Sequence, residues 1–167
     1  AKDLVGNVLR NQAEIVEEFP GSELVGKEYS PLFPGAIDRG ASDSAWTVVA
    51  ADFVTTTDGT GVVHTAVMYG EDDYRLGMEV GFPAQHTVGM DGAFVEGVHE
   101  SLDGRYVKDC DDDIINLLVE SGLLYREHIY THDYPHCWRT DHPLLYYAMD
   151  SWFVKMTAVR DQILSHN

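Results

Sequence analysis

A histidine followed by a run of acids is the arrangement in this chain whose residue types could do chemistry. His64 interrupts an apolar stretch, and Glu71, Asp72 and Asp73 follow after a short glycine-containing connection. If His64 lies on a strand and the acids open a helix, the strand end and the helix start face the same pocket mouth. A carboxylate there can pair with an ammonium group and hold a substrate amine. The spacing is therefore compatible with an amine-recognising pocket at His64 and the acids.

Each of these features also has a structural interpretation. A single histidine in a strand is commonly a structural residue, and acids in the first turn of a helix stabilise the helix dipole. The glycine-rich "DGTG" at 58–61 lacks the Gly-Lys-Ser/Thr ending that a phosphate-binding loop needs before a helix. We interpret it as a hairpin turn between two strands.

A second cluster of polar side chains lies in "HDYPHCWRTDH", at 132–142. Zinc sites usually combine two closely spaced pairs of ligands, and the position three residues after Cys137 is Thr140 rather than a second cysteine. The aspartates at 109 and 111–113 lack the glycine and terminal glutamate of a calcium loop. No serine occupies a G-x-S-x-G elbow, which disfavours a serine hydrolase. We therefore predict no metal site.

Composition limits the function classes. The chain has 167 residues, of which 44% are apolar, so we expect a single folded domain. Its formal charge of −17 disfavours a free-standing nucleic-acid binder, although not a domain that handles one end of a nucleic acid held by a larger protein. No stretch reaches the ~20 apolar residues of a membrane span, and two cysteines are too few for a disulfide framework. The absence of an initiator methionine suggests a fragment of a longer protein.

The apolar pattern predicts a mixed α+β fold. β-branched runs and alternation predict strands within 44–67, 88–98 and 123–132. Acids at the start and glycine at the end predict helices over 71–81, closed by Gly81, and 109–122, closed by Gly122. The end of the tail at 142–164 is also predicted to be helical. We expect mostly strands and hairpins with short helices packed outside.

Two motifs together resemble isoleucyl-tRNA synthetases. "GTGVVHTA…GEDDY" and, some sixty residues later, "YPHCWRTDHPLLYYAMDSWF" resemble the connective-peptide editing domain of that family, and "GSELVGKEYSPLFP" and "LDGRYV" support this. The resemblance covers nearly the whole chain. It implies a β-barrel-like editing domain with peripheral helices over 1–167, in which 131–167 returns toward the synthetic domain.

The resemblance implies hydrolysis of valine that has been wrongly attached to the isoleucine tRNA. Asp73 matches the aspartate that binds the aminoacyl ammonium, and His64 matches the histidine that lines the amino-acid pocket. Water attacks the ester carbonyl, and no protein general base is assigned. The residues that we predict to contact the substrate beside these two are Thr65, Tyr69, Gly70 and Asp72.

The same resemblance implies the partners, which are the 3′ end of aminoacylated tRNA, its valine moiety and the rest of the synthetase chain. No membrane partner is expected, and the two cysteines without a sign of secretion favour a reducing cytoplasm. No cofactor is expected in this domain, whereas ATP and magnesium belong to the parent enzyme. The synthetic motifs HIGH and KMSKS are absent, so this chain cannot make aminoacyl-tRNA alone. The alternative is a non-catalytic docking domain that uses the aromatic tail and the acidic surface.

Three departures from the family pattern bear on activity. Val67 replaces the proline of the usual "HxAPxxG", which alters the connection toward Asp73. Thr140 stands where many members have a zinc-binding cysteine, which agrees with leaving zinc out. The threonine-rich stretch of the editing pocket is expected upstream of residue 1, so the isolated chain is predicted to be weakly active or inactive.

Overall fold

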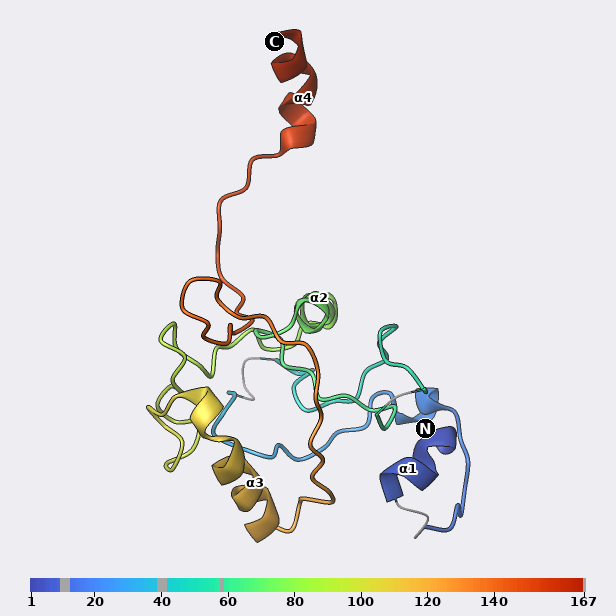
Figure 1. Ribbon diagram of the computed structural model, residues 1–167. Helices are drawn as coiled ribbons and strands as arrows, with labels where there is room; N and C mark the ends of the chain where they lie inside the picture. Colours follow the sequence, from blue (N-terminus) through green and yellow to red (C-terminus); the bar gives the residue numbers. More distant parts are fainter. Residues whose placement is uncertain (10–12, 39–41, 58, 167) are drawn as a thin grey trace.

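The computed structural model describes residues 1–9, 13–38, 42–57 and 59–166. Helices make up nearly all of the regular structure in these ranges (Figure 1). The α-helices are α1 (Val5–Leu9), α2 (Glu71–Val80), α3 (Asp111–Glu120) and α4 (Met156–Ser165). Short 3-10 turns lie at Lys2–Leu4, Gly21–Leu24 and Val107–Asp109.

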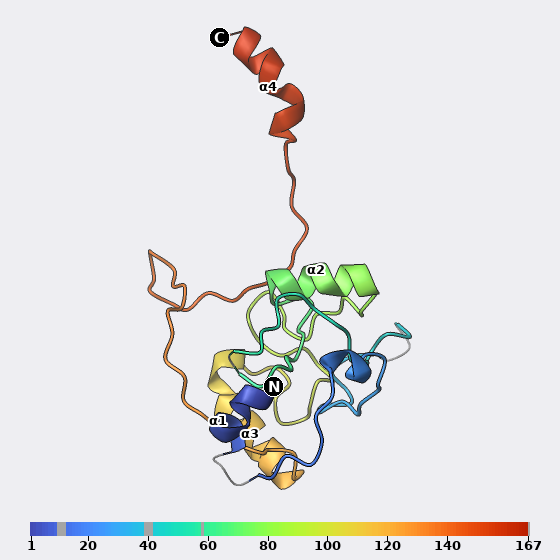
Figure 2. The same ribbon diagram turned by 90° about the vertical axis from the view of Figure 1, so that its right-hand side faces the viewer.

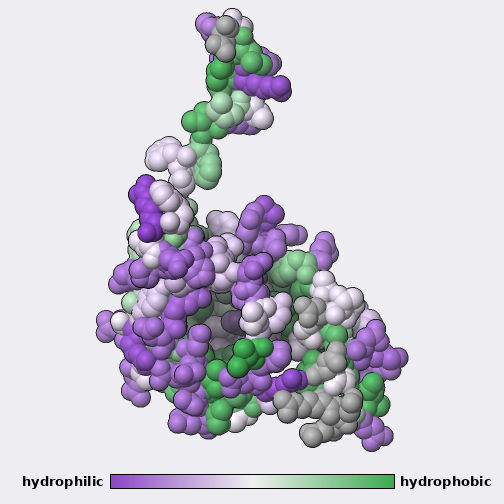
Figure 3. Space-filling view, in the orientation of Figure 1, coloured by the Kyte–Doolittle hydropathy of each residue, from purple (hydrophilic) through white to green (hydrophobic). Residues whose placement is uncertain are grey.

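The chain forms a body with a projecting arm. In Figures 1 and 2, α1, α2 and α3 lie around a body made largely of loops, and α4 stands at the end of an extended segment that leaves this body. Figure 3 shows apolar side chains along the arm, whereas the visible face of the body is mostly hydrophilic. Trp152 in the arm is fully exposed and Phe153 is 89% exposed.

The three helices predicted from the sequence are confirmed. α2 begins after Gly70, carries acids throughout its first turn and ends at Gly81, whose φ of 76° is left-handed. Glycine suits that position because it has no Cβ to clash. α3 also begins with acids, and Gly122 (φ 68°) follows its last turn. The predicted helical end of the tail is α4.

The predicted β-barrel is wrong for the described part of the chain. The β pairing found there consists of isolated antiparallel bridges, which are Glu28–Thr47, Val88–Phe94, Ala93–Tyr106 and His136–Pro143. The expected hairpin around "DGTG" does not pair in the described residues, and its turn residue Asp58 lies outside them. Residues 123–132 likewise form no strand.

The strand prediction was wrong because local preference alone does not make a sheet. Residues 62–66, which carry the β-branched pattern, form neither helix nor strand. Val62 and Val63 are 63% and 53% exposed, so no neighbouring segment among the described residues covers them. A strand needs a neighbouring backbone to accept and donate its ladder hydrogen bonds. In the described part of the chain, 88–98 approaches its predicted strand-turn-strand, through hydrogen bonds between Gly89 N and Ala93 O (2.8 Å) and between Val95 N and Thr87 O (3.0 Å).

A small core holds the body together. Leu102 and Cys110 are completely buried, and the other buried apolar residues are Leu4, Ala45, Val88 and Val98. The loop before α3 is tied to that helix by the 2.7 Å ion pair between Arg105 and Asp113. Of the helices in the described ranges, none combines the length and apolar character needed to cross a membrane.

Candidate functional site

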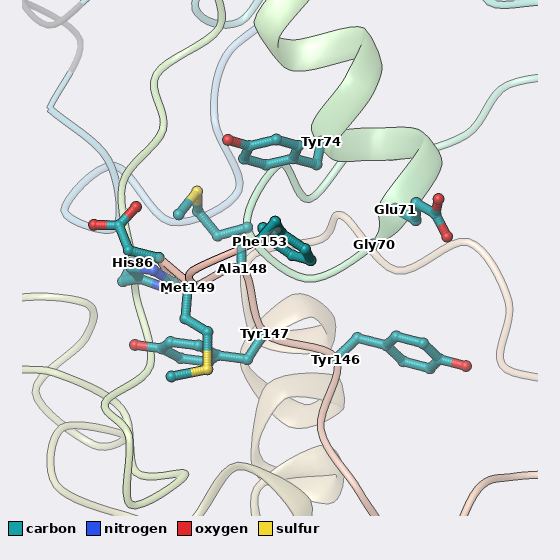
Figure 4. Close-up of a pocket in the computed structure, with 11 residues that line it drawn as sticks. Gly70, Glu71, Tyr74, His86, Tyr146, Tyr147, Ala148, Met149 and Phe153 are labelled. Carbon is teal, nitrogen blue, oxygen red and sulfur yellow. The ribbon is translucent and has the colours of Figure 1, made fainter. Parts of the chain in front are cut away.

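A pocket of about 600 Å³ lies beside the start of α2 (Figure 4). The turn before α2 and its first residues form one side, with Met68, Gly70, Glu71 and Tyr74. His86 and the returning segment 146–150 with Phe153 complete the lining. A hydrogen bond from Ala148 N to Met68 O (2.8 Å) joins the two sides, which are far apart in the sequence.

Stacked rings form part of the pocket lining. The rings of His86 and Tyr147 lie parallel, with centroids 4.1 Å apart and planes at 10°. Tyr69 contacts both rings edge-on, at 5.8 and 6.0 Å between centroids. Edge-on and offset-stacked geometries are the favoured ones for aromatic pairs. The three rings therefore fix one another.

Hydrogen bonds to the backbone at Val88 hold this ring cluster in place. The Tyr69 hydroxyl oxygen accepts from Thr87 N (2.7 Å) and from Val88 N (2.8 Å). The Tyr147 hydroxyl donates to Val88 O at 3.1 Å. Val88 itself is buried, so the cluster is anchored to the core. The Nδ1 atom of His86 is buried and has no hydrogen-bond partner among the described residues.

The first turn of α2 places the acids near the pocket. Gly70 is the N-cap residue of α2 and has an extended backbone. The Asp73 carboxylate lies close beside it, because Oδ2 is 2.7 Å from the position that a Cβ on Gly70 would take. Glu71 pairs with Arg75 at 2.5 Å one turn later. The positive end of the helix dipole stabilises negative charge at these positions.

The six predicted site residues differ from one another in their exposure and in their position relative to the pocket. Gly70 lines the pocket and contacts the half-buried Asp73, while Tyr69 supports the pocket from behind through its ring contacts. Thr65 is half-buried. His64 and Asp72 are exposed. Of these six residues, Gly70 is the one that lines the pocket, and Tyr69 and Asp73 are its neighbours.

Several pocket residues were not identified from the sequence as site residues. Tyr74 lies one helical turn after Gly70, so its position in the predicted helix could have indicated that it faces the same pocket. Tyr147 and Phe153 belong to the aromatic tail, which the sequence marked only as a docking surface. His86 had no local signal, because its role depends on contact with Tyr147, 61 residues later.

The loop at 137–142, which contains Cys137, lies outside the pocket lining. Cys137 N donates to His142 O and Asp141 N donates to Cys137 O, both at 2.8 Å, so the loop is a tight turn. The Thr140 hydroxyl and the backbone amides of Arg139 and Thr140 donate to the thiol and lower the pKa of Cys137. In the described ranges, no three His, Cys, Asp or Glu side chains are grouped closely enough to hold a metal ion.

Comparison with known proteins finds relatives that align with the whole length of this chain. No protein-family model matches it. All 167 residues align with isoleucine–tRNA ligase of Clostridium novyi (strain NT) at 48% identity, and with that of Bacillus thuringiensis (strain Al Hakam) at 46%. Isoleucine–tRNA ligase 2 of Bacillus cereus (strain ATCC 14579) is 44% identical over the same length. The chain spans 16% of the length of each of these relatives.

The resemblance to isoleucyl-tRNA synthetases is therefore confirmed at the level of a segment. The whole chain aligns with about one sixth of a longer protein. The assignment of that segment to the editing domain stays a prediction.

Proposed function

We propose that this chain is the editing domain of an isoleucyl-tRNA synthetase. In this proposal residues 1–167 are one domain that hydrolyses valine mis-attached to the isoleucine tRNA, and 131–167 lead back toward the synthetic domain. The observation that carries the proposal is the 48% identity to an isoleucine–tRNA ligase over the whole chain. The partners are then the 3′ end of the tRNA and the rest of the synthetase chain.

The need for such a domain follows from the energetics of recognition. One extra methylene in an apolar pocket gives only ~1–3 kcal/mol of discrimination, too little to reject valine when isoleucine is activated. A second site that excludes isoleucine and accepts valine removes the error. In the proposal, His64 lines that site and limits the size of the side chain.

Asp73 is the residue we assign to the substrate ammonium. It is half-buried, it lies against Gly70 at the start of α2, and it has no ion-pair partner among the described residues. Glu71, by contrast, already pairs with Arg75. The dipole at a helix N-terminus favours negative charge, and a carboxylate there can form a strong charge-assisted hydrogen bond with an ammonium group.

The chemical step is ester hydrolysis. The oxygen of a water molecule bonds to the ester carbonyl carbon, the bond from this carbon to the ribose oxygen breaks, and a proton passes to the leaving tRNA hydroxyl. Thr65, Tyr69, Gly70 and Asp72 contact or frame the substrate in this proposal. No cofactor takes part here; ATP and magnesium serve the synthetic reaction of the parent enzyme in the cytoplasm.

The test uses the complete synthetase that contains this sequence. Asp73→Ala is expected to abolish deacylation of valyl-tRNA for isoleucine, while attachment of isoleucine to tRNA is retained. Asp112→Asn is the matched control, because Asp112 is an exposed acid in the first turn of α3. Normal deacylation by Asp73→Ala would contradict the assignment.

A non-catalytic docking domain is the second candidate. The fully exposed Trp152 and its neighbours Phe153 and Val154 favour it, because such apolar side chains usually find a partner surface. Replacing Trp152 with Ser separates the two: a docking role predicts lost association with unchanged deacylation, and an editing role alone predicts no loss of association.

A further inference from the structure

The pocket beside α2 combines aromatic rings with carboxylates and lacks a permanent positive charge. Among the described residues that line it there is no lysine or arginine, while Glu71 and Asp150 supply negative charge. The chain as a whole carries −17. Such a surface repels anions and concentrates cations at its openings.

Ring faces are available from both sides of the pocket. Figure 4 shows Tyr74 reaching in from α2 and Phe153 from the returning segment, opposite the stacked His86–Tyr147 pair. The ring of Tyr146 points away from this group in the same view. The face of an aromatic ring carries partial negative charge and attracts an organic cation within about 6 Å.

Thioethers and a carboxylate complete the arrangement. Met68 and Met149 contribute polarisable sulfur atoms and flexible chains that adapt to a small ligand. Glu71 is engaged by Arg75 and points away from the rings in Figure 4. Asp150 lines the pocket without an ion-pair partner among the described residues, so it is the carboxylate that remains for a ligand.

We propose that this pocket binds a small organic cation of the alkylated ammonium class, held against the ring faces of Tyr74, Tyr147 and Phe153 and by the carboxylate of Asp150. An inorganic cation prefers several oxygen ligands and would not use the rings. A purely apolar ligand would use the rings and thioethers but gain nothing from Asp150. The proposed ligand differs from valyl-tRNA, and its binding is measured without deacylation.

The first test compares choline with 3,3-dimethylbutan-1-ol, an uncharged molecule of the same shape. Each is titrated into the 167-residue chain labelled with carbon-13 at the methionine methyl groups. Choline is expected to shift the Met68 and Met149 signals and to bind about tenfold more tightly than the neutral molecule, as a part-exposed cation–ring contact predicts. The signal of the 83% exposed Met90 is expected to stay unchanged. Equal affinities, or no shift at Met68 and Met149, would overturn the proposal.

Variants then separate ring contact from general apolar contact. Phe153→Leu and Tyr74→Leu are expected to weaken choline binding several-fold and to leave the affinity of the neutral molecule nearly unchanged. Both side chains are exposed, at 89% and 41%, so the fold is retained. Trp152→Leu is the matched control, since Trp152 is adjacent and fully exposed but does not line the pocket.

The carboxylate is tested in the same way. Asp150→Asn is expected to weaken choline binding several-fold, and Asp161→Asn, which removes the same charge from α4, is expected to leave it unchanged. Equal effects of the two changes would mean that only net charge matters, and that result would remove Asp150 from the site and overturn the proposal.

Discussion

The ring of His86 stacks on the ring of Tyr147, with centroids 4.1 Å apart and planes at 10°, although 61 residues separate them in the sequence. This contact joins the loop before Val88 to the returning segment and forms part of the pocket lining. Because the Tyr147 hydroxyl also donates to Val88 O, one side chain links the pocket to the buried core.

Removing that hydroxyl is expected to loosen the pocket. Tyr147→Phe keeps the stacked ring but leaves Val88 O without this donor, so the free energy of unfolding should fall by about 0.5–1.5 kcal/mol. Urea denaturation measures the change. Tyr146→Phe is the control, because Tyr146 is 61% exposed, and it should change stability by less than about 0.5 kcal/mol. Equal effects of the two substitutions would contradict the role of Tyr147.

Gly70→Ala should affect the Asp73 carboxylate more than the fold. The new Cβ would stand 2.7 Å from Asp73 Oδ2, so this carboxylate must turn away, while the extended backbone of Gly70 accepts alanine. We expect slower deacylation by the complete synthetase and a loss of about 0.5–1 kcal/mol from the poorer N-cap. Gly21→Ala, where nothing lies within 4 Å, should leave deacylation unchanged. If both variants deacylate normally, deacylation does not depend on the observed position of the Asp73 carboxylate.

Val67 and Gly77 should show coupled effects on stability. A Cβ on Gly77 would approach Val67 Cγ1 and Cγ2 at 2.7 and 2.8 Å, so α2 packs directly on the turn before it. Alanine in place of glycine normally stabilises a helix by about 1 kcal/mol, but overpacking costs about 1–3 kcal/mol. Gly77→Ala alone is expected to destabilise the chain.

The double variant Val67→Ala/Gly77→Ala should recover stability, because the smaller side chain makes room for the new methyl group. A double-mutant cycle from thermal or urea unfolding measures this coupling, which should exceed about 0.5 kcal/mol. Additive effects would show that the two residues do not press on each other.

Asp103 should contribute to stability at neutral pH and not in acid. Its carboxylate accepts from Gly97 N (2.8 Å) and His99 N (2.9 Å), and these hydrogen bonds lower its pKa in the folded chain. The contribution is therefore present above the unfolded pKa of about 3.9 and is lost as the pH falls through the lower folded value.

Asp103→Asn tests this dependence. The variant should be less stable than the parent chain at pH 7. The difference should shrink as the pH falls below about 3.9, where the carboxylate of the unfolded parent chain becomes protonated, and should vanish below the lower folded pKa. Urea unfolding at several pH values follows it, with the exposed Asp161→Asn as control. A difference that is constant from pH 7 to pH 3 would contradict the explanation.

The candidate site was only partly predictable from the sequence. Gly70 lies at a helix start that the acids after it indicate, and that signal lies within a few residues. The role of Asp73, taken from the family resemblance, stays a prediction. His86 was missed because nothing near it in the sequence indicates a pocket. The aromatic tail was noticed, but its ring at Tyr147 acquires a role only by contact with His86.

The sequence by itself determined the helices α2, α3 and α4 and the kinship with isoleucine–tRNA ligases. Helices are predictable because their hydrogen bonds join residues four apart, and the capping signals lie at their ends. The tertiary structure decided that the β-branched runs stay without a sheet in the described residues, and that Ala148 bonds to Met68 beside the pocket. Both depend on contacts between distant segments, which local preference does not specify.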